Sequence, residues 1–184
     1  MRYIALHKPY GVLSQFTGAP KEETLSQFQL PKGVYAAGRL DKDSEGLLLL
    51  TDDGRLKNKL LSPKNKHKKI YWVQVEGIPT EEACKQLQRG VEIKGYRTKP
   101  CTAHAIPTPN VPERNPPIRK RKSIPTSWLS ITLHEGKNRQ VRRMTAKVGY
   151  PTLRLIRVQI EGVLLQDLPA GEWREISKQE IFRQ

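Results

Sequence analysis

Acidic side chains gather in one short stretch of the chain, around residue 41. The stretch reads Gly38-Arg39-Leu40-Asp41-Lys42-Asp43-Ser44-Glu45-Gly46, and Asp52 follows a few residues later. A carboxylate can act as a covalent nucleophile or as a general base, and carboxylates at alternate positions can also bind Ca²⁺. Asp41 is therefore a candidate either for catalysis or for metal binding.

The calcium interpretation is only partly supported by the spacing. Acidic residues stand at the first, third, fifth and twelfth positions counted from Asp41, and Gly46 stands at the sixth, as in a calcium-binding loop. However, the twelfth residue is Asp52 rather than a bidentate Glu, and the ninth is the apolar Leu49. Residues 47–50 read as a buried strand rather than as part of a loop between two helices. We therefore expect no metal site here.

The charge of the whole chain points to a polyanionic partner. The 184 residues carry 33 Lys and Arg against 18 Asp and Glu, a formal net charge of +15. Such a surface attracts RNA, DNA and acidic membranes alike, so charge sets only the partner class. Because the N-terminus has too short an apolar run for a signal peptide and no stretch approaches a membrane span, we expect a cytoplasmic protein without a membrane partner.

Short strand-like and helix-like segments alternate along the chain, which predicts an α+β fold. Strands are expected at residues 3–7, 12–16, 34–38, 47–50, 70–76, 127–134 and 153–160. Helices are expected at residues 55–61, 80–88 and 138–148, the last capped by Asn138, with a short one following the Ser177 and Glu180 capping pair. Residues 107–125 hold six prolines among basic residues, a composition that predicts an irregular basic loop.

Three basic clusters are candidates for RNA contact, although any one of them could be an ordinary solvated surface. The clusters are Lys64, Lys66, Lys68 and Lys69; Arg114 with Arg119, Lys120, Arg121 and Lys122; and Lys137, Arg139, Arg142 and Arg143. The last two are rich in arginine, which suits bidentate phosphate contacts and stacking on unpaired bases.

The stretch around Asp41 resembles the signature of the pseudouridine synthases, and three further motifs agree with it in order. They are Leu6-His7-Lys8-Pro9-Tyr10-Gly11, Lys69-Ile70-Tyr71-Trp72-Val73 and Glu135-Gly136-Lys137-Asn138-Arg139-Gln140-Val141-Arg142-Arg143-Met144. The match spans nearly the whole chain and is similar to the RsuA family of bacterial ribosomal RNA enzymes. The run 125–157 most resembles the branch that acts on large-subunit RNA.

The resemblance implies roles for individual residues. Asp41 corresponds to the catalytic aspartate, which acts while the glycosidic bond of the target uridine breaks, before the uracil turns and rejoins through carbon. Whether it adds to the ribose, adds to the base or helps to form a glycal stays open. Tyr71 corresponds to a tyrosine that stacks on the target base, Arg142 to the basic partner of the carboxylate, and Arg39 to an arginine that holds RNA.

Physical chemistry agrees with these roles, because a carboxylate in a substrate-filled site needs a nearby cation to stay ionised, and a base must leave its stack to react. The residues expected near RNA are Arg39, Lys8, Lys42, Arg114, Arg119, Lys120, Arg121, Lys137, Arg139 and Arg143. No cofactor is expected.

The resemblance also implies the architecture. We expect the pseudouridine synthase fold, a central mixed and mostly antiparallel sheet flanked by helices and loops, with an RNA-binding cleft across its middle. Residues 1–184 should form a single catalytic domain with approximate halves at 1–62 and 63–184, without the small RNA-binding domain that precedes it in many relatives. We expect a monomer.

The expected function is therefore isomerisation of one uridine of 23S ribosomal RNA to pseudouridine. A noncatalytic RNA-binding or ribosome-assembly protein is the alternative, since it would keep the basic clusters but would not need Asp41.

Overall fold

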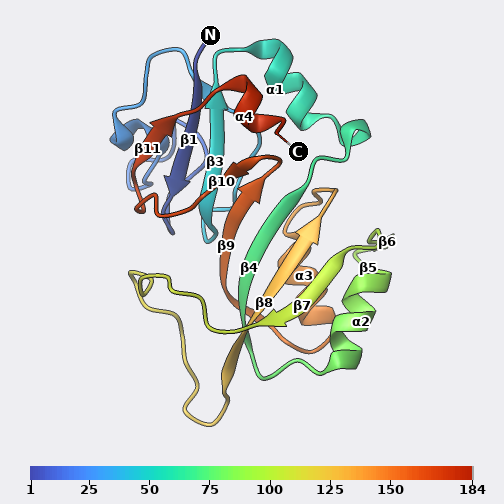
Figure 1. The fold of residues 1–184 in the computed structure, drawn as a ribbon. Helices are drawn as coiled ribbons and strands as arrows, with labels where there is room; N and C mark the ends of the chain where they lie inside the picture. Colours follow the sequence, from blue (N-terminus) through green and yellow to red (C-terminus); the bar gives the residue numbers. More distant parts are fainter. Residues whose placement is uncertain (184) are drawn as a thin grey trace. The chain divides into compact units, whose positions relative to one another are not determined.

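The computed structural model describes residues 1–183, which form two compact units (Figure 1). The first unit contains Met1–Lys69 and the segment that begins at Ile156, and the second contains Ile70–Leu155. The C-terminal segment thus returns to the unit that the N-terminus begins. The expected halves, residues 1–62 and 63–184, are each continuous in sequence and do not include this return.

The first unit is built on strands in the order β11-β1-β3-β9. Strand β1 pairs antiparallel with both β11 and β3, whereas β3 pairs parallel with β9 through Glu45↔Ile156 and Gly46↔Arg157. The short strands β2 and β10 pair antiparallel with β3 and β9, respectively. The strands are β1 Tyr3–Lys8, β2 Tyr35–Ala36, β3 Glu45–Thr51, β10 Val163–Leu164, β11 Trp173–Glu175 and β9 Thr152–Ile160, of which residues 152–155 belong to the second unit. The helices are α1 Gly54–Leu61, α4 Lys178–Ile181 and the 3-10 turns Leu25–Phe28 and Pro63–Asn65.

The apolar run predicted as a buried strand forms the centre of this unit. All seven residues of β3 are buried, which confirms the expectation for residues 47–50. Leu48 and Leu50 pack in one apolar core with Ile4 and Leu6 of β1. Strand β3 is therefore a rigid base for the residues that immediately precede it.

The second unit contains the strand order β4-β8-β7 and two helices. Strands β7 and β8 pair antiparallel, and a small antiparallel hairpin, β5–β6, follows α2. The strands are β4 Lys69–Glu76, β5 Glu92–Ile93, β6 Tyr96–Arg97, β7 Thr102–Ile106 and β8 Thr126–Leu133. The helices are α2 Glu81–Arg89 and α3 Gln140–Lys147. Apolar residues of β4, β8, α2 and α3 share one core.

The fold class predicted from the sequence is confirmed. The sheet is mixed, since β3 and β9 are parallel, whereas β1 with β11, β1 with β3, β2 with β3, β9 with β10 and β7 with β8 are antiparallel. The helices at residues 55–61 and 80–88, the cap at Ser177 and the irregular loop at 107–125 also agree with prediction.

Two local predictions were wrong, and a third, the strand at residues 34–38, was confirmed only in part. Residues 12–16 contribute only an isolated bridge, Val12↔Glu23, and residues 34–38 only the two-residue β2. Asn138 does not cap α3, because Arg139 adopts a left-handed conformation with φ 51° and becomes the first flanking residue. The Ser14 hydroxyl bonds to the distant Leu40 backbone, and the Gln140 side chain accepts from the Lys137 amide just before α3, so side-chain contacts set these two conformations rather than strand or cap propensity.

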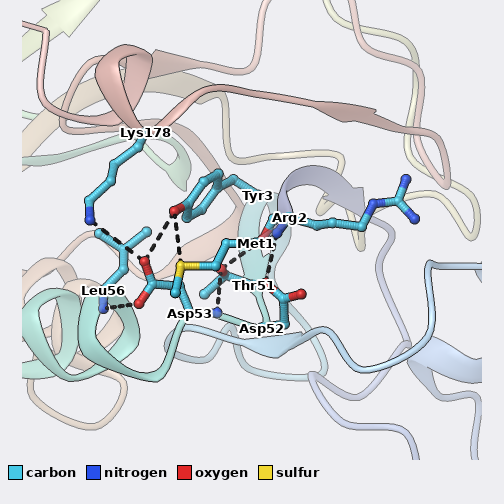
Figure 2. Close-up of polar contacts among 8 residues, drawn as sticks. All are labelled: Met1, Arg2, Tyr3, Thr51, Asp52, Asp53, Leu56 and Lys178. Atoms are coloured by element: carbon cyan, nitrogen blue, oxygen red, sulfur yellow. Dashed lines mark hydrogen bonds and ion pairs between the residues drawn. The ribbon is translucent and has the colours of Figure 1, made fainter.

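A buried carboxylate joins the two ends of the first unit (Figure 2). Asp53 caps α1 by accepting a hydrogen bond from the Leu56 amide at 3.0 Å, and it accepts another from the Tyr3 hydroxyl at 3.1 Å. The Lys178 ammonium of α4 lies 3.6 Å from the same carboxylate. The Leu56 amide bond is the largest influence on the Asp53 pKa, which is lowered. These contacts stabilise the ionised form of Asp53, which joins α1, β1 and α4. We call this group of contacts the Asp53 junction.

Candidate active site

The segment that carries Asp41 is a turn between β2 and β3. Gly38 opens it with φ +110°, a conformation that favours glycine. Leu40 is buried, Asp41 is partly buried, and Arg39 and Lys42 are exposed. The turn therefore presents one carboxylate between two exposed cations. We call residues 38–42 the Asp41 turn.

The backbone of the Asp41 turn is held on both sides of Asp41. The Ser14 hydroxyl accepts from the Leu40 amide at 3.0 Å and donates to the Leu40 carbonyl at 2.7 Å. The Asp41 carbonyl accepts from the Ser44 amide at 3.0 Å, and the Lys42 carbonyl accepts from the Gly11 amide at 2.7 Å. These hydrogen bonds to the backbone on both sides of Asp41 make the segment stiff.

Lys8 lies beneath this turn rather than on the surface. Its side chain is fully buried, and its ammonium donates to the carbonyls of Pro9 and Val12 at 2.7 Å and of Lys42 at 3.4 Å. Burial lowers the Lys8 pKa to about 8, although the acidic residues of the stretch oppose that shift. An ammonium in this position cannot contact a phosphate, so we correct the expectation that Lys8 binds RNA.

Arg157 on β9 is a second buried cation next to the Asp41 turn. Its side chain is 5% exposed, and its Nε donates to the Leu47 carbonyl at 2.8 Å. Its Nη1 donates to the Arg39 carbonyl at 3.4 Å. The only sequence signal for this role was a charged residue at a position of the strand where the alternation favours an apolar one. Ser14 gave no signal at all.

The calcium interpretation fails on geometry. Its fifth to eleventh positions form β3, an extended strand from Glu45 to Thr51. At about 3.3 Å per residue, this strand separates the eleventh position from the fifth by roughly 20 Å, and the twelfth lies beyond its end. The carboxylates of Asp41 and Asp52 therefore cannot surround one ion. Among residues 1–183, no group of three or more His, Cys, Asp and Glu side chains is arranged to hold a metal.

Tyr71 belongs to the second unit, on β4. It is 8% exposed and packs in the core that contains Val73 and Val75, on the face that the strand alternation predicted. A ring held by packing has a fixed plane, as a stacking platform requires.

The loop before α3 forms the first part of the motif at residues 135–144. Glu135 accepts hydrogen bonds from the Tyr96 hydroxyl at 2.5 Å, the Lys99 amide at 2.7 Å and the Gln140 side chain at 3.0 Å. Burial works to raise the Glu135 pKa, but these bonds outweigh it and the pKa is lowered. Gln140 also accepts from the Lys137 amide at 3.0 Å. Glu135 and Gln140, which the sequence interpretation did not single out, therefore fix the entry into α3.

The cations of this motif differ in exposure. Arg142 and Arg143 on α3 are partly buried, as is Arg139, whereas Lys137 is exposed. Arg143 donates to the Asn138 side chain at 3.0 Å, and the Lys137 ammonium lies 4.4 Å from the centre of the Tyr96 ring. The structure therefore places these four cations around the start of one short helix.

The cations of the 107–125 loop divide into two kinds. Arg114 is partly buried and donates to the carbonyls of Pro116 at 2.8 Å and of Pro117 and Leu153 at 3.3 Å. Arg119, Lys120 and Arg121 are exposed, and Arg121 lies 3.4 Å from Glu76. Arg114 therefore shapes the base of the loop, and the exposed residues form its charged surface.

Of the predicted residues, Asp41, Arg39, Lys8 and Lys42 belong to the first unit, and the others belong to the second. In the part of the chain that the structure describes, none of the helices is both long and apolar enough to cross a bilayer.

Known proteins resemble this chain over nearly its whole length. Residues 2–147 match the model of the family described as RNA pseudouridylate synthase. The ribosomal large subunit pseudouridine synthase E of Vibrio vulnificus is 57% identical over 176 residues, covering 96% of this chain and 75% of that protein. The enzyme of the same name from Xanthomonas campestris is 52% identical over 174 residues, covering 93% of each chain.

A solved structure agrees with the sequence relatives. The crystal structure of a pseudouridylate synthase superimposes with a TM-score of 0.80 at 29% identity, covering 98% of this chain and 72% of that one. These matches confirm both the fold and the branch that the motifs predicted, the RluE type. The chain therefore belongs to the RNA pseudouridylate synthase family, as an isomerase of the RsuA family and its RluE-type branch.

Proposed function

We propose that this enzyme converts one uridine of the 23S ribosomal RNA to pseudouridine and that Asp41 is its catalytic carboxylate. The observation that carries the proposal is the agreement between the family match over residues 2–147 and the fixed turn that presents Asp41. The names of the relatives from Vibrio vulnificus and Xanthomonas campestris support large-subunit RNA as the substrate.

The reaction is an isomerisation in which atoms balance without a co-reactant. The bond from N1 of uracil to C1′ of the ribose breaks, and a bond from C5 to C1′ forms. The proton of C5 leaves to solvent, and N1 takes up a proton. Asp41 acts in this sequence through its carboxylate, whose backbone neighbours are already fixed before RNA binds, so little ordering is needed at the moment of reaction.

We propose that Tyr71 stacks on the target base and that Arg142 is the cation that pairs with the catalytic carboxylate. The packed position of Tyr71 supports the first role, because a ring with a fixed plane loses little freedom on stacking. The Glu135 and Gln140 contacts support the second, because they set the start of the helix that carries Arg142.

RNA affinity is proposed to come from exposed or partly exposed cations on both units. They are Arg39 and Lys42 beside Asp41, the loop residues Arg119, Lys120 and Arg121 shaped by Arg114, and Lys137, Arg139 and Arg143 near α3. A ribosomal RNA substrate supports a cytoplasmic location. We propose that the enzyme acts as a monomer.

Release of tritium from ribosomal RNA labelled at uracil C5 tests the proposal. Wild-type protein should release tritium from large-subunit RNA, either stripped of protein or partly assembled, and Asp41→Asn should release none while binding the RNA. Absence of release by the wild type from all of these substrates would overturn the proposed substrate. Release by Asp41→Asn at the wild-type rate would overturn the role of Asp41.

A further inference from the structure

Two residues outside the four sequence motifs contact the Asp41 turn from segments far apart in the chain. Ser14 lies 26 positions before Leu40, and Arg157 lies 118 positions after Arg39. We infer that Ser14 and Arg157 are positioning residues that fix the direction of the Asp41 carboxylate. This inference rests on the proposed catalytic role of Asp41.

Ser14 holds the residue immediately before Asp41. A single hydroxyl accepts from the Leu40 amide at 3.0 Å and donates to the Leu40 carbonyl at 2.7 Å, so it fixes both peptide planes that flank the Leu40 α-carbon. One of these is the plane that leads into Asp41. Removal of the hydroxyl leaves the Leu40 amide and the Leu40 carbonyl without this partner, next to the buried Leu40 side chain. The turn must then shift to satisfy these two groups.

Arg157 holds the peptide group between Arg39 and Leu40, because its guanidinium donates to the Arg39 carbonyl. Its backbone is fixed against β3. A Cβ on Gly46 would lie only 2.7 Å from the Arg157 nitrogen, so the two strands approach more closely than any residue except glycine at position 46 would permit. From this fixed backbone the guanidinium donates to Leu47 on β3 and to Arg39 in the turn. A planar, always charged fork can reach two carbonyls at once. Arg157 thereby ties the turn to the rigid strand.

Neither residue is placed to bind substrate directly. Arg157 is 5% exposed, and both bonds of the Ser14 hydroxyl are directed at the backbone of the turn. Loss of either residue should therefore change the rate of the reaction and leave RNA affinity nearly unchanged. A residue that contacts phosphate would show the opposite division, with a change in affinity that depends on salt.

The test is single-turnover conversion of C5-tritiated large-subunit RNA at saturating enzyme, with the RNA Kd and the Tm measured for each variant. Ser14→Ala should lower the rate constant by about 10- to 100-fold, as expected when a reacting group is displaced by up to 1 Å. Its RNA Kd should stay within about twofold of wild type, in line with the absence of a phosphate contact. Ser26→Ala is the matched control, since Ser26 contacts Thr24 and not the turn, and it should leave the rate unchanged.

Arg157 is tested by Arg157→Lys and Arg157→Met. Lys keeps the charge and can donate to one carbonyl, so it should retain a larger part of the rate than Met, whereas a role in bulk packing alone would make the two equivalent. Arg174→Met is the control, because it removes a partly buried ion pair between Arg174 and Glu180 in the same unit. If Arg157→Met does not fold, Ser14→Ala and Arg157→Lys decide the inference.

Hydrogen exchange gives a readout that does not depend on activity. The Leu40 amide should exchange faster in Ser14→Ala than in wild type, whereas amides in the β3 core should be unaffected. The inference is overturned if Ser14→Ala keeps the wild-type rate while Asp41→Asn is inactive. It is also overturned if the whole defect lies in RNA Kd. A wild-type rate in Asp41→Asn would instead mean that the proposed function has failed.

Discussion

The Asp41 turn and the 107–125 loop are both irregular segments, but they are held in different ways. In the turn, Ser14, Gly11, Lys8 and Arg157 supply hydrogen bonds to the backbone on either side of Asp41. In the loop, Arg114 and Arg154 anchor the base through backbone carbonyls, and Arg119 and its neighbours are exposed. The turn is fixed by buried donors, whereas the loop offers charge at its surface.

This difference matches the demands of two tasks. A reacting carboxylate must stand within a fraction of an ångström of its productive position, which requires backbone groups that are all satisfied. A loop that follows a phosphate backbone needs charge and adaptability more than exact placement. We therefore expect changes beneath the turn to affect stability and rate, and changes in the loop to affect affinity and its salt dependence.

The largest effect is expected from Gly46→Ala. A methyl group would meet the Arg157 backbone, and the φ of +109° is unfavourable for any other residue, so unfolding free energy should fall by about 3 kcal/mol or more. Urea denaturation and tritium release measure the loss. Gly54→Ala at the start of α1, where a Cβ meets nothing within 4 Å, is the control and should be neutral or slightly stabilising. Equal stability of the two variants would show that β3 and β9 do not approach as closely as described.

The next effect concerns Lys8 and pH. Because burial lowers its pKa to about 8, the unfolded chain binds more protons than the folded chain between about pH 8 and the ordinary lysine value. The unfolding free energy should therefore rise with pH in this window, by about 2 kcal/mol between pH 8 and 9.5. Below the window, titration of Lys8 should not change it. Urea denaturation of wild type and Lys8→Met at several pH values measures the difference, and parallel curves would contradict the burial of the ammonium.

A smaller effect, on affinity alone, is expected from the loop. Arg119→Glu with Lys120→Glu should weaken binding of ribosomal RNA about tenfold at low salt and lower the salt slope by about two, while Tm stays unchanged. Filter binding across a salt series measures both quantities. Lys85→Glu with Arg89→Glu on α2 is the charge-matched control. If the control weakens binding as much, the affinity comes from net charge and not from the loop.

The smallest effect is expected at the Asp53 junction, which lies outside both regions. Asp53→Asn should lower Tm by a few degrees and leave RNA affinity unchanged. Since the Asp53 pKa is lowered, its stabilisation is present above the ordinary carboxyl pKa and is lost as pH falls through the folded value. Thermal melts of wild type and variant should therefore converge under acidic conditions, and a constant gap would contradict an ionised Asp53.

Much of this enzyme could be predicted from local sequence. The apolar run of β3, the cap and stop signals of α2 and the proline-rich loop each determine their own structure within a few residues. The motif around Asp41 and its three companions also predicted the family, which the relatives confirm. The alternation of β4 placed Tyr71 on the buried face. These features depend on periodicity and on residue type, which the sequence displays directly.

Tertiary structure alone decided how Asp41 is held. The pairing of Ser14 with Leu40 and of Arg157 with Arg39 joins residues 26 and 118 positions apart, and no local pattern encodes such a partner. Lys8 was expected near RNA because it lies in the first motif, yet carbonyls of Pro9, Val12 and Lys42 accept from its ammonium in the interior. Sequence by itself predicted the carboxylate and the family. Tertiary structure determined which donors hold the turn, Arg157 among them through the return of β9 alongside β3, because hydrogen bonds between distant segments exist only once the chain has folded.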